Sequence, residues 1–494
     1  MKRAIRVSAL AVGIMFALLA GNLTYIQAVD PDHLADNPLN PRGRLERYSI
    51  KRGSILAGTG ADQIEIARSV PNDGRLKYRR EYPNGPLYAT VTGYLSPNMG
   101  SSGLERRFDS TLQGTDPGSF WRNVNDWLGG NDRRGDNVIT TIEPQLQQTA
   151  FEALGNQKGA VVALDPRNGD ILAMVSNPTW DPNTLVGSDG NAVQEAWNAL
   201  NEDPQNPRLN RATSELYPPG STFKVVTASE FLEKGGTLDS SFRDPPSVQL
   251  PGSSARIGNS GRSTCAGGSS ITLRQALVVS CNTTFAQIAI DDGPVALTEQ
   301  AEKFGFNREI PFDTQIAMPT IPKNLDPAQA AQSAIGQFEV RSSPLHMAMI
   351  AGAIANDGVM MTPRLVRSIT DQAGRVIVGP QEGQPLSDAS TPSGRVMSAE
   401  TANAVTSAMV SVVESGTGRR ARMSGVDVAG KTGTAQRGDN QPPHAWFIGF
   451  APAENPTIAV AAIVEGGGDA GDEATGGSVA APIVKEVMEA ALEE

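Results

Sequence analysis

Ser221 and Lys224 are the residues whose types and spacing point most directly to chemistry. A serine hydroxyl is a weak nucleophile until a base takes its proton, and a lysine desolvated at the mouth of a cleft can be that base. Three residues apart on a helix, the two side chains share one face. The pair predicts nucleophilic catalysis, although Ser221 as an ordinary helix cap is the alternative for a motif this short.

The residues around this pair predict a helix that begins at Ser221. A helix before it is excluded by Pro218, Pro219 and Gly220. After it, apolar residues recur at helical spacing until Gly235 and Gly236: Phe223, Val226, Ala228 and Leu232. Ser221 then lies at a helix N-terminus, where unpaired backbone N–H groups and the helix dipole favour negative charge.

Two later segments carry further polar groups. Ser280-Cys281-Asn282 follows an apolar helical stretch at 273–279, and Lys431-Thr432-Gly433-Thr434-Ala435 opens a late strand region. Taken singly, Lys431 is compatible with a solvated strand charge and Asn282 with a turn. Taken together, the order and the spacing of the three segments favour a catalytic set.

Composition excludes several other classes of function. The 494 residues are 39% hydrophobic and 19% charged, which predicts a folded protein of two or three domains, and the net charge of −11 disfavours a nucleic-acid partner. His33, His346 and His444 do not cluster with the two cysteines in a spacing suited to zinc. Neither a Gly-x-Ser-x-Gly elbow nor a nucleotide-binding Gly-x-x-x-x-Gly-Lys loop occurs. We therefore expect chemistry without a metal or another cofactor.

The amino terminus predicts a membrane anchor. Lys2, Arg3 and Arg6 precede an uncharged run at 7–29, which is long enough to span a bilayer, and Asp30 follows it. This charge pattern places the N-terminus inside and the remainder of the chain outside. The alternative is a cleaved signal peptide ending near Ile26-Gln27-Ala28, which also exports the chain.

The remaining chain predicts two further domains, giving boundaries of 1–29, 30–136 and 137–494. The first, rich in Gly, Pro, Asn and Arg, is a small mixed non-catalytic domain with strand-like pieces at 64–67 and 87–91. The second begins with a strand at 137–142, a helix at 145–154 and a hairpin of 160–165 with 170–175. Helical patterns then dominate from 210 to about 410, and strands return after Val428. This order predicts an α+β fold around one largely antiparallel sheet.

The set Ser-x-x-Lys, Ser-x-Asn and Lys-Thr-Gly resembles that of penicillin-binding proteins and class A β-lactamases. Residues 137–494 resemble the transpeptidase domain of the former, with supporting stretches such as Ala334-Ile335-Gly336-Gln337 and Gly416-Thr417-Gly418. Since there is no room for a glycosyltransferase domain, the chain resembles the monofunctional class B, most closely the actinobacterial type called penicillin-binding protein A. Arg52-Gly53-Ser54-Ile55 and Gly103-Leu104-Glu105 resemble the motifs of the pedestal domain in that class.

The resemblance implies the penicillin-recognising serine transpeptidase fold and a set of catalytic roles. Ser221 would attack the carbonyl of the penultimate D-alanine of a peptidoglycan stem peptide, with Lys224 as base. Ser280 would pass the proton to the leaving nitrogen, while Lys431 would keep Lys224 neutral and attract the terminal carboxylate.

The resemblance also implies the groups that bind the substrate. Thr432 and Thr434 would offer hydroxyls to the terminal carboxylate, and Asn282 would bond a substrate amide. Gly433 would let the substrate lie against the strand. The backbone N–H groups of Ser221 and Thr434 would form the oxyanion hole. Expected partners are stem peptides ending in D-Ala-D-Ala, β-lactams that acylate the same serine, the cytoplasmic membrane, and division or elongation proteins.

The cysteines, two departures from the family pattern and one further histidine leave open questions. An even pair in an exported chain favours a disulfide between Cys265 and Cys281, the alternative being two buried thiols. Phe338 stands where the family often has glycine, and His346 where many members have glutamine. We expect His444 to have a substrate-rim or core role rather than a catalytic one.

Two other functions compete with the cross-linking transpeptidase. The first is a hydrolase, either a D,D-carboxypeptidase or a β-lactamase. Class A β-lactamases deacylate through a glutamate, and no Glu-x-x-Leu-Asn segment lies between the second and third motifs. The second is a non-catalytic β-lactam sensor. Such a sensor would need cytoplasmic signalling machinery, and it is disfavoured because only a few residues precede Val7.

Overall fold

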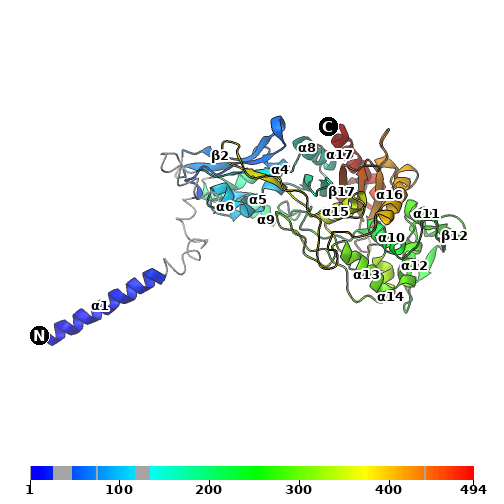
Figure 1. The fold of residues 1–494 in the computed structure, drawn as a ribbon, viewed down its shortest axis with the longest axis horizontal. Coiled ribbons are helices and arrows are strands. Elements are labelled where there is room, and N and C mark those ends of the chain that lie inside the picture. Colours follow the sequence, from blue (N-terminus) through cyan, green and yellow to red (C-terminus); the bar gives the residue numbers. More distant parts are fainter. Residues whose placement is uncertain are drawn as a thin grey trace.

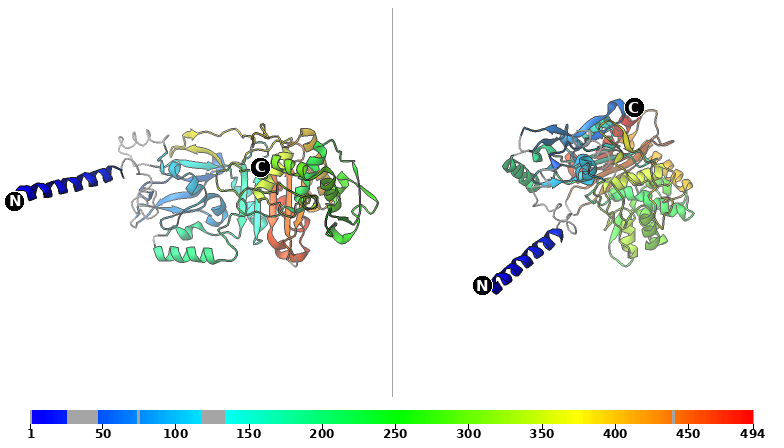
Figure 2. Two further views of the ribbon diagram at one scale, coloured as in Figure 1. Left: turned by 90° about the horizontal axis from the view of Figure 1, so that it is seen from below. Right: turned by 60° about the vertical axis from the view of Figure 1, so that its left-hand side comes forward.

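The structure is a computed structural model that describes residues 2–25, 47–73, 76–116, 134–187, 189–438 and 441–493. Helix α1 (Lys2–Thr24) projects away from the folded part, which is elongated (Figure 1). A sheet containing β2 (Ile64–Pro71) lies at the end near α1, and the sheet containing β17 (Ile458–Val464) lies toward the other end (Figure 2).

Helix α1 is a candidate membrane span. Its segment Ile5–Thr24 has a mean hydropathy of 1.9, and none of it is buried against the protein. A 20-residue apolar helix is long enough to cross the hydrocarbon core, and an N-terminal signal sequence meets the same criteria. The alternative cleavage site at Ile26-Gln27-Ala28 lies outside the described residues.

The N-terminal part is built on a six-stranded sheet ordered β14-β13-β6-β1-β2-β3. Strands β1 and β6 are parallel, and the other neighbours are antiparallel. The sheet takes strands from both sides of residue 137, so the expected boundary at 136/137 runs through a sheet and stays a prediction. Its strands and nearby helices are β1 (Ile55–Ala57), β3 (Tyr78–Glu81), β6 (Asn137–Thr140), β13 (Val366–Thr370), β14 (Val376–Val378), α5 (Gly103–Arg107) and α6 (Asp109–Gln113).

The expected strand-like piece at 87–91 is wrong, because these residues belong to helix α4 (Gly85–Thr92). Their aromatic and β-branched content favours a strand locally. However, Pro86 lies in the first helical turn, where its fixed φ suits a helix. Tyr88 and Val91 are both buried, and a spacing of three places them on one helix face. Burial of this face therefore overrides the local preference.

The C-terminal part has a five-stranded antiparallel sheet ordered β15-β16-β17-β7-β8, which contains the predicted hairpin and the predicted late strands. Helices α8 and α17 pack on one face, and α15 packs on the other. The α+β order of strands, helices and strands is therefore present. The elements are β7 (Gly159–Leu164), β8 (Ile171–Asn177), β15 (Ala429–Ala435), β16 (His444–Ala451), α8 (Pro144–Leu154), α15 (Pro344–Ala355), α16 (Ala399–Glu414) and α17 (Ala481–Glu493).

A helical layer beside β15 carries the first two motifs. Apolar residues of α10 (Lys224–Glu233), α11 (Leu273–Val278) and α12 (Asn282–Asp292) form one buried cluster with Ala408 of α16. Lys224 is the first residue of α10, and Asn282 is the first residue of α12. Lys431 lies in the edge strand β15. Other elements of this region are α9 (Gly190–Glu202), α13 (Pro294–Lys303), α14 (Pro327–Ser333) and the paired short strands β9 (Ser241–Arg243) with β12 (Ser270–Thr272) and β10 (Ser247–Gln249) with β11 (Arg256–Gly258).

Candidate active site

Ser221 lies in a tight turn packed directly on strand β15. A 3-10 turn at Gly220–Phe223 leads into α10, so the expected helix is present with a tighter first turn. Gly220 has a φ of +55°, and a Cβ on it would lie 2.9 Å from the carbonyl oxygen of Thr434. A Cβ on Gly433 would lie 2.9 Å from the carbonyl oxygen of Pro219. The two glycines therefore allow the close approach that brings Ser221 beside Thr434.

Lys224 is fully buried at the start of α10. Its Nζ donates to the backbone oxygen of Ser280 at 2.8 Å and to Oδ1 of Asn282 at 2.6 Å. Burial, and secondarily the charge of Lys431, lowers the pKa of Lys224 well below its ordinary value. This environment favours the neutral amine, which is the form that a general base requires.

The hydroxyl of Ser280 connects the two buried lysines. Its Oγ lies 3.4 Å from Nζ of Lys224 and accepts a hydrogen bond from Nζ of Lys431 at 2.9 Å. Ser280 adopts the left-handed conformation with a φ of +59°, which turns the side chain between the two lysines. Burial lowers the pKa of Lys431 to about 7, and its Nζ also donates to the backbone oxygen of Thr432.

The carboxamide of Asn282 is engaged at both ends. Its oxygen accepts from Lys224, and its Nδ2 donates to the backbone oxygen of Gly258 at 2.9 Å. Asn282 therefore holds the lysine against strand β11. The expected bond from Asn282 to a substrate amide stays a prediction.

The two threonines of the third motif share one face of β15, since side chains alternate along a strand. Thr434 is exposed, while Thr432 is buried and its Oγ1 lies 2.7 Å from Oγ1 of Thr417. Gly433 points the other way, toward Pro219 and Thr222. Its missing side chain thus serves packing of the nucleophile turn, and its expected contact with substrate stays a prediction.

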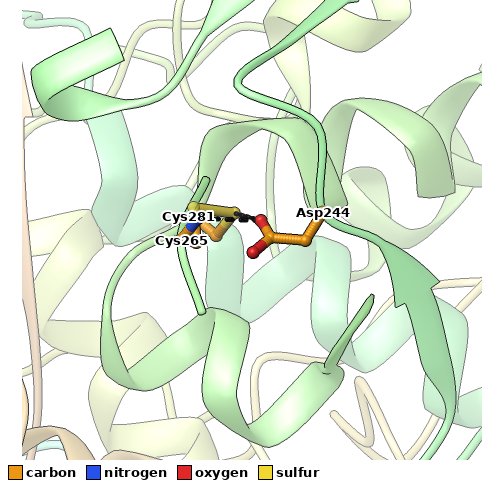
Figure 3. A group of neighbouring side chains, drawn as sticks. All are labelled: Asp244, Cys265 and Cys281. Atoms are coloured by element: carbon orange, nitrogen blue, oxygen red, sulfur yellow. Dashed lines mark hydrogen bonds between the residues drawn. A yellow bond between two sulfur atoms is a disulfide. The ribbon is translucent and has the colours of Figure 1, made fainter. Parts of the chain in front are cut away.

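A disulfide joins Cys265 and Cys281, the middle residue of the second motif (Figure 3). The carboxylate of Asp244 accepts the backbone N–H groups of Cys265 and Ala266 at 2.8 and 2.6 Å. The three side chains lie close enough together to hold an ion. However, the thiolates that a metal needs are consumed in the bridge.

Glu465 and its partners were missed by sequence reasoning. Its Oε1 accepts from the hydroxyl of Tyr217 at 2.7 Å and from Nε of Arg211 at 2.8 Å. Lys158 lies 3.1 Å from the other oxygen. Tyr217 begins the Tyr-Pro-Pro-Gly segment before Ser221, so Glu465 braces this segment from the end of β17. No local pattern marks a contact between residues 248 positions apart.

His346 and His444 are both buried. His346 is within 2.8 Å of the Ser342 hydroxyl and 2.7 Å of the Phe304 carbonyl oxygen, and burial lowers its pKa to about 4. Nδ1 of His444 accepts the backbone N–H of Gly466, and burial lowers its pKa to about 4 as well.

Comparison with known families agrees with this geometry. Residues 159–489 match the penicillin binding protein transpeptidase domain, and residues 52–138 match the penicillin binding protein A dimerisation domain. The peptidoglycan D,D-transpeptidase PbpA of Mycolicibacterium smegmatis is 42% identical over 503 residues, covering 100% of both chains. That of Mycobacterium tuberculosis is 41% identical over 506 residues, covering 100% of this chain and 99% of the relative.

Solved structures lead to the same group. A ceftriaxone acyl-enzyme complex of penicillin-binding protein A from M. tuberculosis is 41% identical, with a TM-score of 0.85 over 91% of this chain and 100% of that one. Its penicillin G acyl-enzyme complex gives a TM-score of 0.84 at 41% identity over 90% and 100%. The expected fold and family are confirmed: the chain belongs to the penicillin-binding protein transpeptidase family.

Proposed function

We propose that the chain is a peptidoglycan D,D-transpeptidase that forms its acyl-enzyme on Ser221. The observation that carries this proposal is the Ser280 hydroxyl between the buried amines of Lys224 and Lys431. Burial disfavours a charge on either amine, and two neighbouring cations disfavour each other. Lys224 is therefore the neutral base, and Lys431 retains the proton.

Acylation then proceeds through these side chains. Lys224 takes the proton of Ser221 as its Oγ attacks the carbonyl of the penultimate D-alanine. Ser280 passes a proton to the leaving nitrogen, and the terminal D-alanine departs. The amine of a neighbouring stem peptide attacks the acyl-enzyme, which forms the cross-link and frees Ser221. β-Lactams acylate Ser221 by the same route.

Binding groups flank the nucleophile. The backbone N–H groups of Ser221 and Thr434 form the oxyanion hole, which the close packing of Gly220 on β15 supports. Thr432 and Thr434 bind the terminal carboxylate near the charge of Lys431. Asn282 bonds a substrate amide with its carboxamide in addition to holding Lys224. Gly433 lets the nucleophile turn pack on β15, which keeps Ser221 beside the strand edge where the substrate lies.

Placement at the membrane is part of this proposal. Helix α1 retains the chain in the cytoplasmic membrane, with basic residues inside and residues 30–136 and 137–494 outside. The pedestal domain beside the span offers a surface to division or elongation proteins.

The proposal is tested with the full chain in detergent micelles, labelled with a fluorescent penicillin and followed by intact mass. We expect a long-lived adduct on Ser221, no adduct in Ser221→Ala, and cross-linked dimers from a stem-pentapeptide substrate and an amine acceptor. Rapid loss of the adduct with hydrolysis of the drug would establish the hydrolase instead. A stable adduct without cross-linked product would favour the sensor.

A further inference from the structure

Thr417 lies in the connection between α16 and β15, beside the third motif. Its side chain is exposed, and its Oγ1 lies 2.7 Å from Oγ1 of the buried Thr432. Thr434, two residues further along β15, is also exposed and on the same strand face as Thr432. Three hydroxyl-bearing residues therefore border one edge of the candidate active site.

The backbone of Thr417 is held by α11 and by Gly477. Its N–H donates at 3.2 Å to the carbonyl oxygen of Val278, two residues before Ser280. Its own carbonyl oxygen is packed so closely on Gly477 that a Cβ there would lie only 2.2 Å away. Gly416, immediately before it, is packed on Val278 in the same way, at 2.3 Å. The Thr417 backbone is thus held beside the second motif, and the hydrogen bond to Thr432 holds its hydroxyl beside the third.

The paired hydroxyls have a definite hydrogen-bonding capacity. Each has one proton to donate, and one of the two protons is used in the bond between them. The other remains for an acceptor, whichever of the two hydroxyls supplies it. Lys431 contributes a positive charge nearby, since its Nζ donates to the backbone oxygen of Thr432. A fixed donor beside a cation suits a carboxylate.

We propose that Thr417 is a further substrate-binding residue, whose hydroxyl completes the site for the terminal carboxylate together with Thr432 and Thr434. The inference rests on the proposed function, because the carboxylate in question is that of the D-Ala-D-Ala stem peptide or of a β-lactam. It assigns to Thr417 selectivity for ligands that carry this negative charge.

The test compares Thr417→Val, which keeps the shape of the side chain and removes the hydroxyl, with Thr417→Ser, which keeps the hydroxyl. Thr237→Val is the matched control, since Thr237 is also exposed and paired with a hydroxyl, that of Ser240, but follows the far end of α10. The rate constant for acylation of Ser221 is measured on the full chain in micelles. The two probes are benzylpenicillin and its methyl ester, which lacks the carboxylate.

We expect Thr417→Val to slow acylation by benzylpenicillin about tenfold, the usual effect of losing one hydrogen bond to a charged group. Acylation by the ester should be nearly unchanged, and Thr417→Ser and Thr237→Val should behave as the wild type. Thr432→Val should add little when combined with Thr417→Val, because the two hydroxyls act as a unit.

Three results would overturn the inference while leaving the proposed function intact. These are an unchanged rate in Thr417→Val, an equal loss with both probes, or a failure of Thr417→Ser to retain the rate. If the wild-type chain is not acylated on Ser221 by benzylpenicillin, the proposed function fails, and the inference fails with it.

Discussion

Lys224 and Lys431 approach the same oxygen atom, Oγ of Ser280, at 3.4 and 2.9 Å. Both amines are fully buried. Among the described residues, the oxygens that accept their hydrogen bonds are all neutral. The cost of a second charge in this space is therefore high. Burial lowers the pKa of both amines, and the charge of Lys431 lowers that of Lys224 further, so Lys224 is the amine that favours the neutral form.

Replacement of Lys431 by Met should raise the pH at which acylation begins. Acylation needs neutral Lys224 and is lost as the pH falls through its pKa. The charge of Lys431 lowers that pKa, in addition to the larger effect of burial. Without the charge the pKa rises, so the acidic limb of the rate profile should shift upward and the maximum should fall. Acylation by benzylpenicillin is measured between about pH 5 and pH 9. An acidic limb that stays in place would show that Lys431 does not control Lys224.

Tyr217→Phe should slow acylation without weakening the initial binding of benzylpenicillin. The change removes the hydrogen bond to Glu465 and loosens the segment that precedes Ser221. Loss of a hydrogen bond to a charged group costs about 1.5–3 kcal/mol, so we expect a decrease of about ten- to a hundredfold in the chemical step. Stopped-flow acylation separates this step from binding.

The matched control for Tyr217 is Tyr82→Phe in the N-terminal part. The Tyr82 hydroxyl is also buried and lies 3.3 Å from a glutamate oxygen, that of Glu105. This variant should lose stability and retain the acylation rate. Equal rates in Tyr217→Phe and the wild type would contradict a positioning role for Tyr217.

The site was predictable where chemistry depends on local spacing. Ser221 and Lys224 are close because a single turn separates them. Periodicity predicts the helix that carries Lys224 and the helical stretch that precedes Ser280. The contacts of Glu465 and Thr417 depend on how β15, β16 and β17 register with distant segments. Tertiary packing sets that register, and no single stretch of sequence contains it.

The same distinction explains the fold. Strands such as β7, β16 and β17 can be predicted from their apolar residues, because burial in a sheet determines which residue types they contain. The local composition of α4 predicts a strand, whereas its packing in the folded protein requires a helix. The sharing of one sheet by β1 and β13, more than 300 residues apart, also lies beyond any local signal.

Removal of the disulfide by the paired changes Cys265→Ala and Cys281→Ala should lower the free energy of unfolding. The bridge closes a loop with a separation of 16 residues, for which the entropy of the unfolded chain predicts a loss of about 3 kcal/mol. Denaturant unfolding with and without dithiothreitol is the measurement. Reductant should destabilise the wild type and leave the variant unaffected. A wild type that is indifferent to complete reduction would contradict this stabilising role.

Glu230→Gln should remove a pH dependence of stability. Burial, and next the nearby carboxylate of Asp292, raises the pKa of Glu230 from 4.5 to about 7. Between these values the folded protein holds a proton that the unfolded chain has lost, so the free energy of unfolding falls as the pH rises. The wild type should lose on the order of 2 kcal/mol across this window relative to Glu230→Gln.

Glu233 lies on the same helix and supplies a control of opposite sign. Burial acts to raise its pKa, but hydrogen bonds from Thr401 and Ser398 outweigh this effect and lower it. Its ionised form therefore stabilises the fold, and that stability is lost as the pH falls through its folded pKa. Glu233→Gln should be less stable than the wild type at neutral pH, and the difference should shrink in acid. Urea unfolding of the wild type and both variants over a pH series measures this. The stability difference between wild type and variant should change with pH in opposite directions for Glu230→Gln and Glu233→Gln, and a change in the same direction would contradict the assignment.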